Sequence, residues 1–217
     1  MSGSKPKQTP TNGVRKAPSF DPAPSGRLAA KALKETGVAA AIIGRLAVWN
    51  WLPNVSDHAY TKDLDFAVTL ADQVKLRAWA AANGLATHEL QIGGFNVSSE
   101  VALTNVDFID RCNPEWGNLG TLYEASIGAA MRAGTRLNVG GRLLSVVPTE
   151  HLLVMKLAAG RQKDEDDVKA LLETTALQIE VVRQLIRAHC GPALVSRFEE
   201  LLQRMGHPQA KPKYRNS

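Results

Sequence analysis

Thr61-Lys62-Asp63-Leu64-Asp65-Phe66-Ala67-Val68 places two aspartates one residue apart. It is rich in strand formers, and successive side chains on a strand point to opposite faces, so Asp63 and Asp65 are expected to share one face. Two carboxylates on one face form half of a site for a hard divalent cation such as Mg²⁺, which completes its shell with water and phosphate oxygens. The alternative is a strand edge with two solvated aspartates, because Asp-x-Asp is a short and common pattern.

The composition is ordinary for a globular protein with basic tails. The 217 residues are 44% hydrophobic and 22% charged. No apolar run reaches the ~20 residues needed to span a bilayer, and residues 1–26 lack a signal-peptide core, so we expect a cytoplasmic protein without membrane contact. Residues 1–24 and 207–217 each carry a net charge of +3, and the remainder of this +5 chain nets about −1. The tails can attract phosphate or serve solubility alone.

The order of patterns along the chain favours an α+β fold. Strand and helix patterns alternate up to Val147, and only helical patterns follow. We therefore predict a mixed β-sheet flanked by helices in residues 26–147 and a helical region in 148–206, with a disordered basic arm in 1–25 and a basic tail in 207–217. The predicted helices span 28–36, 46–52, 71–83, 122–133, 148–159, 164–173, 179–189 and 193–205, and Asp164 is expected to cap the sixth. The predicted strands span 38–43, 62–68, 87–92, 95–101, 106–109, 137–139 and 143–147, with two-residue hairpin turns at Gly93-Gly94 and Gly140-Gly141.

A third carboxylate is available in the predicted strand 106–109. Asp107 and Asp110 face opposite sides of that strand, so only one of them can join Asp63 and Asp65. We choose Asp107, because it lies within an apolar run where an unpaired carboxylate is costly. Asp110, at the strand end, is expected to be solvated or to act as a cap. Three such carboxylates would hold two Mg²⁺ ions roughly 3.5–4 Å apart, activating a hydroxyl and stabilising a departing pyrophosphate.

Four segments between residues 36 and 173 carry a family resemblance. They are Ile42-Ile43-Gly44-Arg45-Leu46-Ala47, Thr61-Lys62-Asp63-Leu64-Asp65, Val106-Asp107-Phe108-Ile109, and Pro148-Thr149-Glu150-His151-Leu152 followed by Met155-Lys156-Leu157-Ala158-Ala159-Gly160-Arg161-Gln162-Lys163-Asp164 and Asp167. The first three resemble the nucleotidyltransferase superfamily with the DNA polymerase β-like fold, and the fourth is similar to its AbiEii-type toxin branch. The resemblance implies Mg²⁺-dependent transfer of NMP from an NTP to a hydroxyl of tRNA or protein. It also implies a toxin of a toxin–antitoxin or phage-defence pair, with a cognate antitoxin as partner.

The resemblance also implies roles for individual residues. Asp63, Asp65 and Asp107 would be the metal ligands and catalytic carboxylates, with Asp107 as the base for the incoming hydroxyl. The nucleotide would be bound by Gly44, Arg45, Lys62 and Lys156, while Arg161, Lys163, Asp164 and Asp167 fall on the same family pattern. For Lys156 the alternative is a surface lysine that lies along the helix.

One position departs from the family pattern. The loop glycine is usually followed by a second glycine or a serine, and here that position is Arg45. An arginine can contact phosphate in a bidentate manner, or it can block the close approach of the backbone. The second possibility leads to an alternative function, a catalytically silent nucleotide- or RNA-binding module. A further alternative is an enzyme that adenylylates a small molecule such as an antibiotic, because a fold does not fix the acceptor.

Overall fold

A computed structural model of the chain describes residues 21–52, 63–99 and 102–206. The predicted nucleotide-binding residue Lys62 and the basic tail in 207–217 lie outside these residues, as does most of the predicted arm. Among the described residues, no helix combines the length and apolarity that crossing a bilayer requires.

A five-stranded mixed sheet forms the centre of the N-terminal part. Its strands are β1 (Ala41–Ile42), β2 (Leu64–Ala67), β3 (Ala86–Glu89), β4 (Gly94–Ser99) and β5 (Thr104–Ile109), in the spatial order β1-β2-β5-β4-β3. Only β2 and β5 pair in parallel, and the other neighbours are antiparallel. Parallel neighbours end at the same edge of a sheet, so side chains from β2 and β5 meet there. A separate hairpin, β6 (Arg136–Val139) and β7 (Arg142–Ser145), joins β1 through a bridge between Ile42 and Val146.

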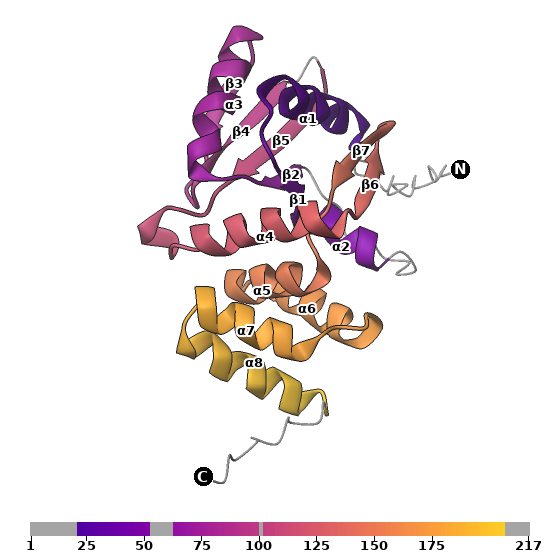
Figure 1. The fold of residues 1–217 in the computed structure, drawn as a ribbon, viewed down its shortest axis with the longest axis vertical. Helices are drawn as coiled ribbons and strands as arrows, with labels where there is room; N and C mark the ends of the chain where they lie inside the picture. Colours follow the sequence, from indigo (N-terminus) through magenta and orange to yellow (C-terminus); the bar gives the residue numbers. More distant parts are fainter. Residues whose placement is uncertain (1–20, 53–62, 100–101, 207–217) are drawn as a thin grey trace, which may run out of the picture.

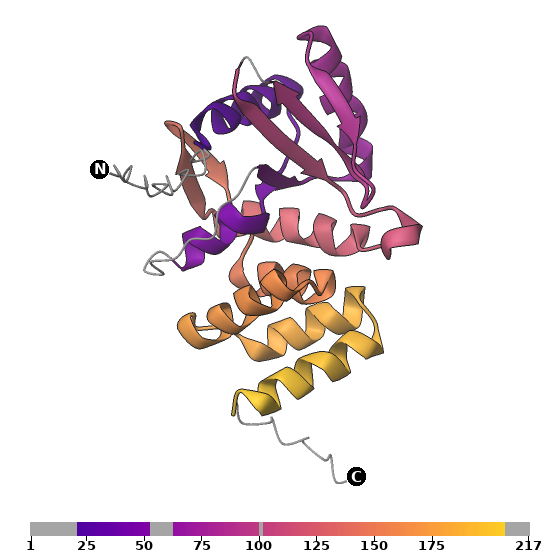
Figure 2. The same cartoon turned by 180° about the vertical axis from the view of Figure 1, so that it is seen from behind.

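Helices α1 (Ala23–Thr36) and α3 (Leu70–Ala82) pack against each other and against one face of the sheet (Figure 1). The view from behind shows β4 and β5 in front of these two helices (Figure 2). Helix α1 ends at Gly37, which adopts the left-handed conformation at φ 68° that favours glycine. Helix α3 begins at Thr69, whose side chain accepts a hydrogen bond from the Asp72 N–H.

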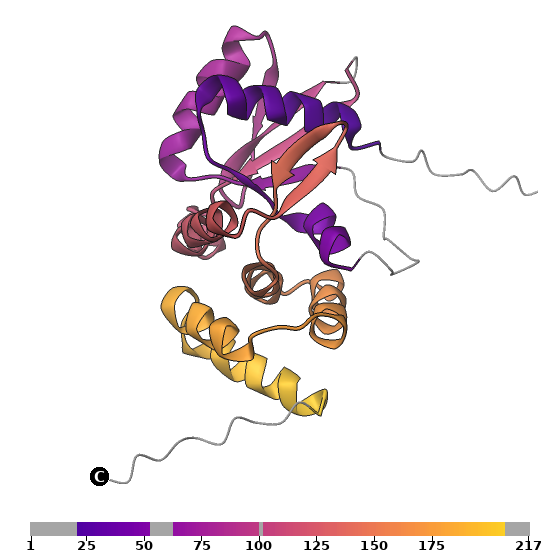
Figure 3. The same cartoon turned by 45° about the vertical axis from the view of Figure 1, so that its right-hand side comes forward.

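The remaining helices lie beyond the end of the sheet. Helices α2 (Gly44–Trp51) and α4 (Gly120–Ala133) contact its first strands, with the short helix η1 (Pro114–Trp116) before α4. Below them lie α5 (Thr149–Ala159) and α6 (Gln162–Thr174), followed by α7 (Ile179–His189) and α8 (Pro192–Arg204) (Figure 3). Helix α5 is buried on nearly every side because it packs between α2 and α4 above and α7 and α8 below.

The structure confirms the predicted α+β class, with a mixed sheet flanked by helices and a helical C-terminal part. The Gly140-Gly141 turn is also confirmed, since Val139 pairs with Arg142 directly across it. The Gly93-Gly94 turn is wrong: Gly94 belongs to β4, and the first pair beyond the loop is Glu89 with Phe95. The strand predicted at 38–43 is paired only over Ala41–Ile42, where it meets β2.

Candidate active site

Three carboxylates meet where β2 and β5 run side by side. Asp65 in β2 is directly opposite Asp107 in β5, and Asp63 comes one residue before β2. One oxygen from each of the three side chains lies within 4.8 Å of the other two. The structure therefore brings together the three aspartates that the sequence singled out, as the parallel register of the two strands requires.

The electrostatics of this cluster are unfavourable without a counter-charge. Burial, and then the neighbouring Asp63 and Asp107, raise the pKa of Asp65 to about 8, while Lys156 and Lys163 act in the opposite direction. Burial also raises the pKa of Asp107, although the hydrogen bond from Asn96 opposes this. Asn96 lies on the neighbouring strand β4, and its side-chain amide donates a hydrogen bond of 2.5 Å to Asp107 Oδ1. A carboxylate cluster of this kind is a donor set that fits a hard divalent cation.

Gly44 lies directly against the cluster, at the start of α2. Its φ is +65°, and a Cβ at this position would lie 1.8 Å from Asp65 Oδ2. Both the backbone conformation and the space therefore exclude a larger residue here. The glycine turn lets the first turn of α2 approach the carboxylates.

Two of the predicted cations, Lys156 and Arg45, belong to a buried ion network. Lys156 on α5 is 7% exposed, so the interpretation as a surface lysine is wrong. Its Nζ lies 2.9 Å from Asp164 Oδ1 and 3.0 Å from Asp167 Oδ2. Asp167 also accepts a hydrogen bond from Arg45, and Asp164 accepts one from Arg161 at 2.6 Å. Burial acts to raise the pKa of Asp164, but Arg161 and Lys156 outweigh it and lower that pKa below its ordinary value.

This network corrects the prediction for Asp164 and shows the partner of Arg45, whose predicted role in nucleotide binding stays a prediction. Asp164 is not the N-cap of α6: Arg161 precedes the helix, and the Asp164 side chain is fully buried in ion pairs. Arg45 points to Asp167 on α6 and is not among the residues that line the cavity beside the aspartates. It therefore neither fills the space next to Gly44 nor presents its guanidinium there.

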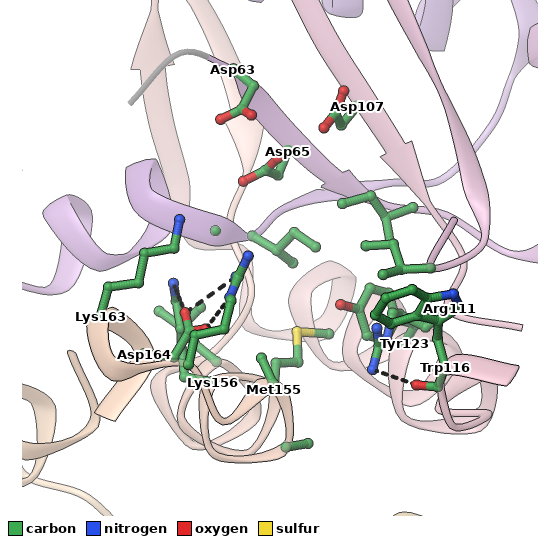
Figure 4. A pocket seen from close by; sticks show the side chains of 18 residues that line it. Asp63, Asp65, Asp107, Arg111, Trp116, Tyr123, Met155, Lys156, Lys163 and Asp164 are labelled. Atoms are coloured by element: carbon green, nitrogen blue, oxygen red, sulfur yellow. Dashed lines mark hydrogen bonds and ion pairs between the residues drawn. The ribbon is translucent and has the colours of Figure 1, made fainter. Parts of the chain in front are cut away.

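A cavity of about 430 Å³ lies between the carboxylates and the helices α4, α5 and α6 (Figure 4). Lys156, Lys163 and Asp164 lie on one side of it, and Arg111, Trp116 and Tyr123 lie on the other. The full lining is Ile43, Gly44, Asp63, Asp65, Ile92, Asp107, Ile109, Arg111, Trp116, Tyr123, Leu152, Met155, Lys156, Ala158, Ala159, Arg161, Lys163 and Asp164.

Several of these residues were not predicted from the sequence. Arg111, Trp116 and Tyr123 follow β5 in the chain, and no motif marks them. Asn96 could have been predicted as a neighbour of Asp107, because the two residues are directly opposite each other once the register of β4 and β5 is known.

Asp110 is buried, so the expectation of a solvated side chain is wrong, while the alternative of a capping residue is confirmed. It is 2% exposed. Its Oδ1 accepts the Cys112 N–H at 2.8 Å, and its Oδ2 accepts a hydrogen bond from Gln73 on α3. Asp110 therefore caps the turn after β5 and ties it to α3, on the face opposite the cluster.

Comparison with solved structures identifies the fold. An antigenic nucleotidyltransferase-like protein from Paracoccidioides brasiliensis is 15% identical, with 88% of this chain and 92% of that one covered at a TM-score of 0.52. This chain has a nucleotidyltransferase-like fold. Weaker likenesses are to ANT(2'')-Ia in complex with adenylyl-2''-tobramycin (18% identity, 77% and 93% covered, TM-score 0.47) and to the lincomycin-bound lincosamide antibiotic adenylyltransferase LnuA (14% identity, 69% and 95% covered, TM-score 0.43). No family model and no curated protein match the sequence.

Within this nucleotidyltransferase-like fold, the carboxylate cluster lies on the two parallel strands and faces the first turn of α2. At these identities the likeness concerns the fold alone.

Proposed function

We propose that this chain is a Mg²⁺-dependent nucleotidyltransferase that transfers an NMP from an NTP to a hydroxyl acceptor and releases pyrophosphate. The observation that carries the proposal is the cluster of Asp63, Asp65 and Asp107 against the Gly44 turn, within 4.8 Å of one another on the wall of a cavity with cations on its far side. A nucleoside triphosphate is a substrate that needs both parts, a carboxylate-bound cation and fixed positive charge.

Different residues of the cavity have different proposed roles. Asp63, Asp65 and Asp107 would hold the cation, which when bound supplies charge neutralisation at the reacting phosphate. The Gly44 turn leaves room for phosphate at the first turn of α2, where unpaired N–H groups favour anions. Lys163, and Lys156 within its ion pairs, supply positive charge for the β- and γ-phosphates.

Asp107 is the residue we assign to accept the proton of the acceptor hydroxyl. Its carboxyl is fixed by the Asn96 amide, and burial raises its pKa above the ordinary value of an aspartate. A base works best when its pKa lies closer to the working pH, so this environment suits the role.

The test is label transfer from α-labelled NTPs. Wild-type protein and the double variant Asp63→Asn/Asp65→Asn are incubated with Mg²⁺, each NTP in turn, and total tRNA, cell lysate or no acceptor. We expect label on a macromolecule with the wild type alone. Equal labelling by the double variant, or none by folded wild type under any condition, would contradict the proposal.

The acceptor that we propose is the 3′ end of tRNA or a protein side chain, and the biological role is that of a toxin with a cognate antitoxin, as in the AbiEii-type branch. The support is the segment that carries this resemblance: its residues on α5 and α6 supply the cationic wall of the cavity. Expression of the wild type should arrest growth of a host cell, and expression of the double variant should not. Growth arrest by both proteins would show that toxicity does not depend on nucleotidyl transfer, which would contradict the toxin mechanism proposed here.

A small-molecule acceptor is the second candidate. The cavity of about 430 Å³ is within the usual range for sites that bind small ligands, roughly 300–1,000 Å³. Adding hydroxyl-bearing antibiotics as acceptors to the same assay distinguishes the two candidates. The silent-module alternative was motivated by Arg45, which is paired with Asp167 in this structure, and label transfer by the wild type would exclude it.

A further inference from the structure

The cavity has two chemically different ends. On the α5–α6 side lie Lys156 and Lys163, and on the opposite side lie Arg111, Trp116 and Tyr123 (Figure 4). In the proposed reaction the α-phosphate lies at the carboxylates and the β- and γ-phosphates extend towards the cations. The nucleoside, which stays bonded to the α-phosphate, extends away from the cations. The opposite end of the cavity has room for it.

The aromatic end offers a surface for a flat ring. Trp116 lines the cavity, yet 52% of the residue is exposed, so part of its surface is not covered by the rest of the chain. Tyr123 on α4 is 8% exposed and closes the same end from below. Stacking on an exposed aromatic face is the common way for proteins to hold a nucleobase in the absence of base pairing.

Arg111 is held in place by its surroundings. It is one of two non-glycine residues with positive φ among the described residues, at 57°. The conformation is fixed on both sides, because the Cys112 N–H donates to Asp110 Oδ1 at 2.8 Å and the Leu119 N–H donates to the Arg111 carbonyl at 2.9 Å. Its guanidinium donates to the Trp116 carbonyl at 3.3 Å. A strained residue that its neighbours hold in this manner is typical of binding sites.

The side chains at this end also set a chemical preference. A guanidinium has donors only, so it pairs with a carbonyl acceptor such as the O6 of guanine or the O4 of uracil, and it is mismatched with the exocyclic amine that takes this place in adenine and cytosine. We propose that Arg111, Trp116 and Tyr123 form the nucleobase subsite of the NTP, in which Trp116 stacks on the base and Arg111 selects keto bases, guanine or uracil, over the amino bases of adenine and cytosine. This inference rests on the proposed function and names the substrate class of the same site.

The test is a binding titration on the full chain in Mg²⁺ with the four NTPs and with tripolyphosphate, which has the phosphates but no base. Wild type is compared with Trp116→Ala, Trp116→Phe and Arg111→Asn; asparagine tolerates positive φ, so this last change removes the guanidinium with little added backbone strain. Leu143→Ala, on the exposed hairpin strand β7 outside the cavity, is the control.

We expect wild type to bind GTP and UTP about 10-fold more tightly than ATP and CTP, the scale of one hydrogen bond from a charged donor. Trp116→Ala should weaken all four NTPs about 10-fold, the scale of one lost stacking contact, while tripolyphosphate affinity stays unchanged. Trp116→Phe should retain most of the wild-type affinity for NTPs. Arg111→Asn should reduce the difference in affinity between NTPs with keto bases and NTPs with amino bases.

The outcomes separate this inference from the proposed function. Unchanged NTP affinity in Trp116→Ala, a preference for amino bases in the wild type, or weaker tripolyphosphate binding in Arg111→Asn would overturn the base subsite alone. Failure of the folded wild type to bind either tripolyphosphate or any NTP in Mg²⁺ would overturn the proposed function and this inference with it.

Discussion

At the scale of single residues, Asp65 carries the largest electrostatic cost of the site. Its carboxyl is surrounded by two others and by the α2 backbone, and these surroundings raise its pKa from 3.8 to about 8. The folded metal-free protein therefore holds a proton there at pH values where the unfolded chain does not. Such an arrangement costs stability unless a cation binds.

The pH dependence of the metal-free protein follows from this shift. Because the folded pKa lies above the unfolded one, the favourable contribution of Asp65 is complete below pH 4 and is lost as the pH rises towards 8. Asp65→Asn removes this loss, so the variant should melt several degrees above wild type at pH 8 without metal and gain little at pH 4. Thermal melts between these values test it, and parallel pH profiles for the two proteins would contradict it.

Addition of Mg²⁺ should reverse the order of the melting temperatures of wild type and Asp65→Asn at pH 8. The cation binds the folded state only, so it should raise the melting temperature of wild type at pH 8. The same addition should leave Asp65→Asn nearly unchanged, because one ligand of the cluster is gone. A control variant with an intact cluster, Asp166→Asn on the exposed side of α6, should respond to Mg²⁺ as wild type does.

Gly44 is the second residue with a direct prediction, and the chain supplies its own control. Gly37 has nearly the same φ, 68° against 65°, but a Cβ there would meet nothing within 4 Å. Gly37→Ala should therefore cost only the left-handed strain, about 1 kcal/mol, and keep activity. Gly44→Ala adds the collision with Asp65 and should lose transfer activity and Mg²⁺ binding as well. Equal activity of the two variants would show that the close approach of α2 is unimportant.

At the scale of elements, the ion network connects α2, α5 and α6. Asp167 on α6 is the shared partner of Arg45 on α2 and Lys156 on α5. Removing one member of a buried ion network leaves charge uncompensated, which typically costs about 3–5 kcal/mol. We expect Asp167→Asn to be destabilised by about 3 kcal/mol in urea unfolding, whereas Asp166→Asn, one position earlier and exposed, should change by less than about 0.5 kcal/mol. A similar loss of unfolding free energy in both variants would mean that the network does not stabilise the packing of the three helices.

The elements differ in how well the sequence predicted them. Helix ends at Gly37 and Gly160 were predictable, because a left-handed glycine is a local signal. The short pairing of β1 was not, since apolar runs do not show where a neighbouring strand ends. The Asp164 cap failed because its partner Lys156 comes from another helix, and local rules describe only neighbours in the sequence.

The same distinction holds within the site. Strand alternation predicted that Asp63 and Asp65 share one face, and the position of Asp107 within an apolar run made it the third carboxylate. The parallel register of β2 and β5 brings the three together. Arg111, Trp116 and Tyr123 were missed because they reach the cavity from the turn after β5, from η1 and from α4, and no local sequence pattern encodes this meeting of three segments.

At the scale of the whole molecule, the cavity lies where the sheet part and the helical part meet. Its carboxylates come from β2 and β5, and its cations come from α5 and α6. Helix α5 packs against α2 and α4 on one side and α7 and α8 on the other, so it couples the two parts. The division into residues 26–147 and 148–206 is kept as a proposal, with the site at the junction of both.

The central claim is that the carboxylate cluster directs attack at the α-phosphate of an NTP. The most direct measurement compares α-labelled with γ-labelled NTP in the same transfer assay with Mg²⁺ and the acceptor mixture. We predict that the α label appears on the acceptor, that the γ label appears only as pyrophosphate, and that Asp63→Asn/Asp65→Asn forms neither product. Transfer of the γ label to the acceptor, or α-label transfer that persists in the double variant, would contradict the account.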